Sequence, residues 1–304
     1  MGQPRIVLFV AASAIVIAAC SVAASPGGTG SSTPPSGQPS VQPSSGPTGS
    51  PDPSGLILRT TMEGGFINPA AIRTRLPIVS VFADGRIITE GATPAIYPGP
   101  LVPPLIVRSV GATGATGILA AAKAAGLIGS DATYGPGPVP DASTTVVTVV
   151  HDGAQTVSRF GSLASDVGLP RASGPDAQVI TATADLLARL AGTDTFGGSG
   201  QPDQTYLPLG YQLFVSPGAP APADPQLGRP PVSWPLATPL ASFGKADELG
   251  GDGARVGVVI GSDAATLGPI LTSASQITPF ASGGQQWTIA VKPLLPDEVA
   301  ALGG

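Results

Sequence analysis

The segment TTVVTVVHDGAQTVSRF, residues 144–160, decides the kind of fold that we expect for this chain. Its first seven residues are all Val or Thr, whose β-branched side chains favour strands. His151-Asp152-Gly153 follows as a turn, and alternating residues lead from Gln155 to Phe160. Asp-Gly between two such runs is the strongest local signal for a β-hairpin. The segment therefore predicts two antiparallel strands that pair with each other.

Similar signals continue on the N-terminal side of this hairpin. Residues 78–89 predict a second hairpin around Asp84-Gly85, and residues 56–61 and 105–110 predict single strands. A helix is expected at 115–125, with Thr113 as its cap and Gly126 as the residue that ends it. Its expected core-facing residues are Ile118, Leu119 and Ala122.

The strongest helix signal lies at residues 175–191. Pro175 suits a first helical turn, and Gly192 follows in the position that ends helices. Residues with helical spacing lie between them, namely Val179, Ile180, Thr183, Leu186, Leu187 and Leu190. This helix is therefore amphipathic and is expected to pack against the core.

Strands and a helix recur beyond a Gly-rich break at 197–200. Strands are expected at 211–215, 255–260 and 287–291, and Ser262 is the expected cap of a helix in which Pro269 should cause a kink or a restart. Hairpins mixed with helices, without regular alternation, favour an α+β fold with mixed, largely antiparallel sheet hairpins and about three helices. Strand, helix and returning strands occur in both halves, which leaves open two similar subdomains.

The first twenty residues differ from everything that follows them. Residues 1–5 carry one positive charge, and residues 6–19 are an unbroken apolar or small run that ends at Cys20. This run is shorter than the roughly 20 residues that a membrane-spanning helix needs. Residues 1–19 are therefore expected to be a signal peptide.

Ile17-Ala18-Ala19-Cys20 resembles the lipobox of bacterial lipoproteins, in which a branched apolar residue and two small residues precede a cysteine. The resemblance implies cleavage before Cys20, a diacylglycerol on its thiol and usually a further acyl chain, such as palmitate, on the new amino terminus. Two or three acyl chains make a stable anchor, so Cys20 is the expected lipidation site and the membrane an expected partner. The alternative is a cysteine without a lipid, in an ordinary secretory signal or a single-span anchor.

Residues 20–55 have the composition of a tether. Of these 36 residues, 25 are Pro, Gly or Ser, which cannot build a packed core. As a flexible coil the tether spans roughly 30 to 36 Å. It is expected to separate the membrane from one globular domain at 56–304, which could divide near 197–203.

Four segments of the globular part resemble uncharacterised lipoproteins of actinobacterial type. They are 83–88, Tyr97-Pro98-Gly99-Pro100, the helix end at 124–127 and the strand at 144–150. These lipoproteins have no established activity, so the resemblance implies a location at the cell envelope and carries no reaction or ligand.

Composition excludes several classes of function. With 14 Lys and Arg against 19 Asp and Glu, the chain has a formal charge of -5 and lacks the basic surface that nucleic acid requires. One cysteine allows neither an intrachain disulfide nor a zinc site built on cysteines. Charged residues make up 11% of the chain, where about 25% is usual, so the surface is expected to be largely neutral.

Candidates for catalysis are few. The single histidine, His151, lies in the expected turn beside Asp152 and is expected to be exposed. Ser242-Phe243-Gly244-Lys245 matches the Ser-x-x-Lys pattern of penicillin-recognising enzymes, but Gly244 weakens the helical turn that would join the two side chains. The companion motifs Ser-Asp-Asn and Lys-Thr-Gly do not follow.

Two further clusters have a structural and a functional interpretation. Asp247-Glu248 and Asp252 could hold Ca²⁺, although a solvated turn is expected. Trp234, Phe243 and Trp287 could form a platform for sugar rings, although a place over the core is expected.

The sequence therefore favours a lipid-anchored extracytoplasmic protein that binds or scaffolds at the cell envelope, without catalytic residues, cofactor or metal. Its expected partners are the membrane, through Cys20, and an envelope protein or cell-wall component. The alternative is an envelope hydrolase that uses dispersed carboxylates or Ser242 and Lys245.

Overall fold

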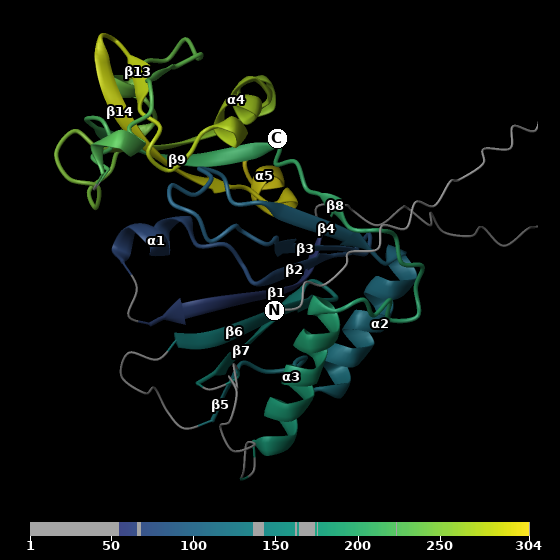
Figure 1. Cartoon of the computed structure of the whole chain (residues 1–304). Coiled ribbons are helices and arrows are strands. Elements are labelled where there is room, and N and C mark those ends of the chain that lie inside the picture. The colour runs from purple at the N-terminus through teal and green to yellow at the C-terminus, as the bar shows by residue number, and fades with distance from the viewer. Residues whose placement is uncertain are drawn as a thin grey trace, which may run out of the picture. The chain divides into compact units, whose positions relative to one another are not determined.

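The computed structural model of this chain describes residues 55–65, 68–135, 143–161, 163, 174, 176–222 and 224–303. They belong to one compact unit, Gly49–Gly304. The signal peptide, the lipobox, Cys20, residues 20–54 of the tether and Pro175 lie outside the described residues. The described residues form two mixed, mostly antiparallel sheets with helices, which confirms the predicted α+β fold (Figure 1).

The larger sheet contains the predicted hairpin at residues 144–160. In spatial order its strands are β5 (Ala132–Tyr134), β7 (Ala154–Phe160), β6 (Ser143–His151), β1 (Leu56–Gly64), β2 (Val79–Phe82), β3 (Arg86–Glu90), β4 (Leu105–Ser109) and β8 (Gln204–Thr205). All neighbours are antiparallel except β5 and β7. Both predicted hairpins, β2–β3 and β6–β7, are confirmed.

The smaller sheet is formed by the C-terminal part of the chain. In spatial order its strands are β10 (Val232–Ser233), β13 (Phe280–Ser282), β14 (Gln285–Pro293), β9 (Gly210–Pro217), β12 (Arg255–Ile260) and β11 (Lys245–Ala246). The three long strands match those predicted, whereas the two-residue and three-residue strands were not predicted because so few residues carry no periodic signal.

The α-helices in the described part of the chain are α1 (Pro69–Thr74), α2 (Gly111–Ala124), α3 (Ala177–Ala191), α4 (Gly261–Ser273) and α5 (Pro296–Ala300). Short 3₁₀ turns occur at Pro225–Leu227 and Leu240–Ser242. Helices α2, α3 and α4 are the three that the sequence predicts. The five-residue and six-residue helices α5 and α1 were missed.

The predicted caps of α2 and α4 are wrong. Thr113 and Ser262 lie inside the helices, whose N-caps are Val110 and Ile260. In both places a strand passes into a helix through one glycine with positive φ, Gly111 at +68° and Gly261 at +60°. Such a junction leaves no loop in which a capping side chain could sit. Helix α4 also runs through Pro269 without the expected restart.

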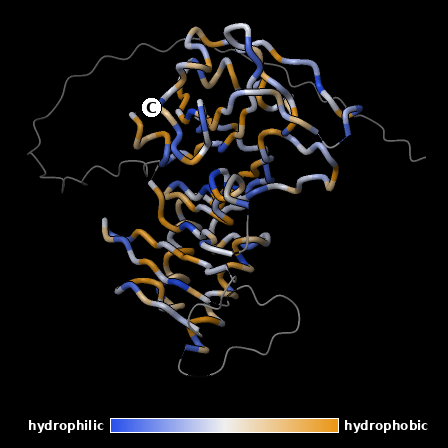
Figure 2. The backbone as a smooth tube through the Cα atoms, turned by 90° about the vertical axis from the view of Figure 1, so that its left-hand side faces the viewer, coloured by the Kyte–Doolittle hydropathy of each residue, from blue (hydrophilic) through white to orange (hydrophobic). Residues whose placement is uncertain are grey.

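Helices α2 and α3 lie side by side on one face of the larger sheet (Figure 1). Figure 2 shows hydrophobic and hydrophilic residues interspersed along the chain. In β14 buried residues alternate with more exposed ones, as expected of a strand with one face on the core, whereas all four residues of β2 are buried. Leu186 and Leu190 of α3 are buried with Ile118 of α2 and with Val147 and Val149 of β6. This packing confirms the predicted apolar face of α3.

A second core joins α4 to the smaller sheet, and a third core joins the two sheets. The third core contains Phe82 and Ile88 of the larger sheet, and Tyr206 and Leu295 from the chain before and after the smaller sheet. Arg59 of β1 adds an ion pair of 2.8 Å to Asp297 of α5. The two sheets are thus held together by both apolar and ionic contacts.

Candidate functional site

The segment of residues 91–104, between β3 and β4, lies between two cavities. The first cavity is lined by Thr93, Pro100, Leu101 and Pro103 of this segment. The second cavity is lined mainly by alternate residues, namely Ala92, Pro94, Ile96, Pro98, Pro100, Val102 and Pro104, and also by Gly99 and Pro103. Alternation is expected of an extended chain, whose successive side chains point in opposite directions.

Backbone hydrogen bonds hold this segment in place although it is rich in proline. Gly91 donates to the Pro104 carbonyl at 2.8 Å, which closes the base of the loop. Leu101 donates to the Ala274 carbonyl at 3.0 Å, and Gln276 donates to the Gly99 carbonyl at 3.0 Å. The segment is therefore bonded to the chain that follows α4, and the two cavities share its prolines as walls.

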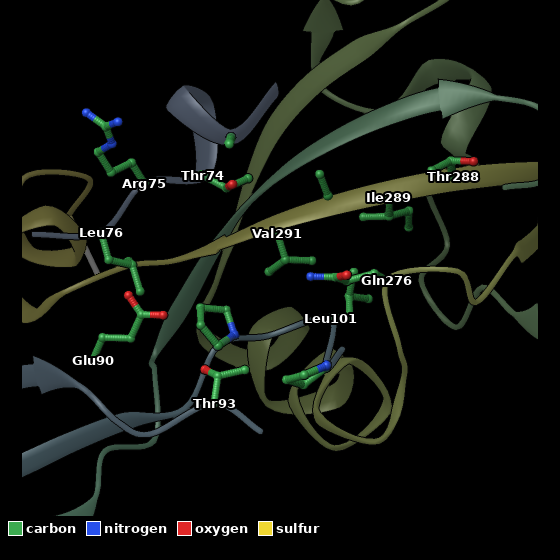
Figure 3. A pocket seen from close by; sticks show the side chains of 14 residues that line it. Thr74, Arg75, Leu76, Glu90, Thr93, Leu101, Gln276, Thr288, Ile289 and Val291 are labelled. Atoms are coloured by element: carbon green, nitrogen blue, oxygen red, sulfur yellow. The ribbon is translucent and has the colours of Figure 1, made fainter. Parts of the chain in front are cut away.

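The first cavity, which we call the mixed pocket, has a volume of about 490 Å³. Arg75 and Glu90 lie at one end and Thr288 at the other, with Leu101 and Val291 between them (Figure 3). The Arg75 guanidinium already donates to the Met62 carbonyl at 2.7 Å. Glu90 is the only carboxylate among the lining residues. The mixed pocket therefore lacks the paired carboxylates that glycoside hydrolysis needs.

The second cavity, which we call the apolar groove, has a volume of about 970 Å³. Its walls come from three segments, residues 92–105, residues 205–211 and residues 264–275. Seven of its lining residues are prolines: Pro94, Pro98, Pro100, Pro103, Pro104, Pro208 and Pro269. Among the described residues, no Asp, Glu, Lys, Arg or His lines it. Its volume and its apolar walls are typical of a site for a small apolar ligand.

Large apolar side chains are exposed along the apolar groove. Ile96 keeps 66% of its surface exposed and Leu207 keeps 75%, and both line the groove. Their neighbours Tyr97 and Leu209 are also more than half exposed. Exposed apolar groups that gather around a concavity mark a binding surface more often than scattered ones do.

Two tyrosines of the apolar groove differ in their hydrogen bonding. The Tyr206 hydroxyl donates to the Leu294 carbonyl at 3.3 Å. Tyr211 is buried, with 3% of its surface exposed, and no described residue hydrogen-bonds its hydroxyl. Burial raises the pKa of Tyr206 to about 12 and also raises the pKa of Tyr211. Both hydroxyls therefore stay protonated at neutral pH and can act as donors.

The structure does not bring Ser242 and Lys245 together. Ser242 ends a 3₁₀ turn and its hydroxyl donates to the Pro239 carbonyl at 3.3 Å. Lys245 lies in β11, and Gly244 between them has a φ of +52°, which turns the chain away from a helix. Neither side chain lines the mixed pocket or the apolar groove.

His151 is the last residue of β6 and lies outside both cavities. It is half-buried rather than fully exposed, and its Nε2 lies 3.5 Å from a carboxylate oxygen of Asp152. Asp152 and Gly153 form the turn, with φ values of +50° and +75°.

Asp247 corrects the expectation of a solvated turn. Its carboxylate is buried and forms an ion pair with Arg73 of α1, whose guanidinium also lies 4.2 Å from the centre of the Phe214 ring. It also accepts a hydrogen bond from the backbone N–H of Leu249 at 3.3 Å. Glu248 and Asp252 are exposed, as expected. Sequence reasoning missed the ion pair because its partners lie far apart in the chain.

The aromatic residues Trp234, Phe243 and Trp287 belong to the core of the smaller sheet. Trp287 and Phe243 are buried, and Trp234 meets Phe243 edge to face with ring centres 6.0 Å apart. The expected place over the core is therefore confirmed for these three residues.

The described ranges contain neither a metal-binding cluster nor a membrane-spanning helix. His, Cys, Asp and Glu side chains there form no group of three that could hold a metal ion. No helix there has the length and apolar character that crossing a membrane requires.

Sequence reasoning missed the apolar groove as a site. One of its walls contains Pro98-Gly99-Pro100, part of a segment that the sequence connects only with lipoproteins of no established activity. The lining residues are mostly apolar or small and come from three distant segments, and no local pattern in the sequence brings them together.

Comparison with known proteins gives no relative to reason from. No family model, no curated protein and no solved structure matches this chain.

Proposed function

We propose that this protein is a lipid-anchored extracytoplasmic module that binds an apolar ligand in the apolar groove without transforming it. The observation that carries the proposal is the groove itself, which is large, uncharged and edged by exposed Ile96 and Leu207. Its walls offer hydroxyl groups but no imidazole, amine, carboxylate or thiol. Such walls can hold a ligand and contain no group of the kinds that most often act as general base.

The anchor part of the proposal is supported by the sequence alone. Residues 1–19 have the features of a signal peptide, Ile17-Ala18-Ala19-Cys20 has those of a lipobox, and residues 20–55 have those of a tether. An acylated Cys20 would hold the domain within roughly 30 to 36 Å of the membrane surface if the tether is a flexible coil. A ligand-binding domain in this position has access to lipids and to other envelope components.

Site-specific photocrosslinking in living cells tests the binding site. Leu207, at the apolar groove, is replaced by p-benzoylphenylalanine in the full-length protein, and Leu249 is replaced in a matched control. Leu249 is 85% exposed and does not line the groove. We expect one discrete adduct at residue 207 and none at residue 249 after irradiation. Equal adducts at both positions, or none at either, would contradict the proposed function.

Cell fractionation tests the anchor. The Cys20→Ser variant lacks the thiol that would carry the diacylglycerol, so we expect it to leave the membrane fraction, whereas the wild-type chain stays there. A Cys20→Ser variant that stays in the membrane fraction as the wild type does would refute the anchor.

A further inference from the structure

We infer that the ligand of the apolar groove is the acyl chain of a lipid, and that the Tyr211 hydroxyl donates a hydrogen bond to the carbonyl oxygen of its ester. This inference rests on the proposed function, because it names the ligand class of the same groove.

The lack of charged groups among the described residues that line the groove favours a hydrocarbon ligand. Because no ionisable group except the two tyrosines lines it, a charged part of a ligand would lose its hydration there without gaining an opposite charge. A hydrocarbon chain has no such cost, and each methylene that leaves water adds to the free energy of binding. The headgroup of a lipid can stay in water at the open side of the groove.

The backbone around the groove disfavours a peptide. Each residue of a bound peptide brings one N–H and one C=O that need partners when they leave water. The seven prolines of the groove have no N–H. The backbone N–H groups of Leu101, Tyr206 and Gln276, at or beside the groove, already donate to carbonyls of the protein. An acyl chain needs none of these donors.

The Tyr211 hydroxyl is the donor that the inference uses. Tyr211 is buried among the lining residues, and its hydroxyl has no partner among the described residues, whereas Tyr206 is bonded to Leu294. Gly268 of α4 also lines the groove, and a Cβ at this position would lie 3.1 Å from the Tyr211 oxygen. The hydroxyl therefore lies against the glycine in the groove wall. One unused donor suits a ligand with one ester carbonyl on a long apolar chain.

The size of the groove fits the same class of ligand. At roughly 30 Å³ for a group the size of water, about 970 Å³ holds about thirty such groups. The groove is therefore large enough for all the methylene groups of one long acyl chain. A chain that enters over Ile96 and Leu207 would also cover apolar surface that is otherwise exposed to water.

Photolabelling with a defined lipid tests the inference. The full-length protein is reconstituted in phosphatidylcholine vesicles with a trace of lysophosphatidylcholine that carries a diazirine in its acyl chain. An ether analogue of this probe lacks the carbonyl and is otherwise matched to it. In the wild type we expect label on residues 92–105, 205–211 and 264–275, with roughly fivefold preference for the ester, the worth of one hydrogen bond.

Two variants distinguish binding of the acyl chain from the hydrogen bond to its ester carbonyl. Tyr211→Phe should lose the preference for the ester and still bind the ether probe as the wild type does. Gly268→Leu should lose labelling by both probes, since its side chain fills the groove. Ala265→Phe, at an exposed lining position, repeats this test if Gly268→Leu fails to fold.

The outcomes distinguish this inference from the proposed function. Label spread evenly over the exposed surface, or unchanged in the groove-filling variants, would overturn the acyl-chain inference. An ester preference that Tyr211→Phe keeps would overturn the role of the hydroxyl. A protein adduct at residue 207 in cells, without lipid labelling of the groove, would overturn the inference and leave the proposed function standing. No adduct in cells would overturn the proposed function itself.

Discussion

Helices α2 and α4 begin in the same way and pack differently. Each follows a strand through a glycine with positive φ, and each has glycine in its interior, Gly114 and Gly117 in α2 and Gly268 in α4. At Gly117 a Cβ would lie 2.1 Å from the Phe196 carbonyl oxygen, which belongs to the backbone. At Gly268 it would lie 3.1 Å from the Tyr211 hydroxyl, which belongs to a side chain.

The difference shows which helix is packed closely against backbone and which helix borders a groove. Helix α2 lies directly against the backbone that follows α3, so there is no room for a Cβ at Gly117. Helix α4 turns part of its surface to the apolar groove, where Gly268, Pro269 and Ala265 line the wall. The same kind of junction from strand to helix thus leads to a closely packed helix in one half and to a helix that lines a groove in the other.

The largest effect is expected when one methyl group is added at Gly117, and the same change at Gly268 is the comparison. Gly117→Ala forces the backbone at Phe196 to move, and we expect the free energy of unfolding to fall by about 3 kcal/mol, the upper range for overpacking. Gly268→Ala needs only a small shift of Tyr211 and gains helix propensity, so we expect a change of less than about 1 kcal/mol. Urea unfolding of both variants measures the difference, and equal losses would break the comparison.

Alkaline pH tests the buried tyrosine at the groove. Since burial raises the pKa of Tyr206 from its usual 10 to about 12, the folded state holds this proton between these values while the unfolded state releases it. The stabilisation is complete below pH 10 and is lost as the pH rises toward 12. We expect a loss of about 2 kcal/mol from this group.

Urea unfolding on both sides of pH 10 measures this loss, and Tyr206→Phe is the control. The phenylalanine variant should show a smaller decrease between the two pH values, although it lacks the hydrogen bond to the Leu294 carbonyl and starts from a lower stability. The same decrease in both proteins would show that Tyr206 is not the group responsible.

A smaller effect is expected from a threonine in each half. Thr183 of α3 is fully buried and its hydroxyl has no hydrogen-bond partner among the described residues. Thr183→Val removes this hydroxyl at nearly constant volume, and we expect the protein to become more stable by about 1 kcal/mol. Thr272 of α4 is exposed at the groove, so Thr272→Val should change stability by less than about 0.5 kcal/mol. Thermal unfolding of both variants checks this, and a destabilised Thr183→Val would mean that its hydroxyl has a partner in solution.

Local signals account for the parts of the fold that the sequence predicts. The β6–β7 hairpin follows from β-branched residues around Asp152-Gly153, and the buried face of α3 follows from its apolar spacing. The caps at Thr113 and Ser262 were wrong because a capping residue needs a loop, and whether a strand leads directly into a helix depends on how both pack.

The site was less predictable than the fold. The ion pair of Arg73 and Asp247 and the apolar groove both join segments that are distant in the chain. Ser242 and Lys245 match a pattern in sequence, but the pattern presupposes a helical turn that Gly244 does not allow. A motif of this kind has chemical meaning only when the backbone between its residues has the right conformation.

The sequence by itself determined the α+β class, the hairpins and the main helices, because strand and helix periods and turn residues act over a few neighbouring residues. It also carries the lipobox pattern at Cys20, on which the expected anchor depends. Only the tertiary structure decided that apolar residues and hydroxyl groups from three segments line a groove without charged groups, and that the Tyr211 hydroxyl has no hydrogen-bond partner among the described residues. The reason is physical: a cavity and an unused donor are properties of the space between segments, and no single segment carries either of them.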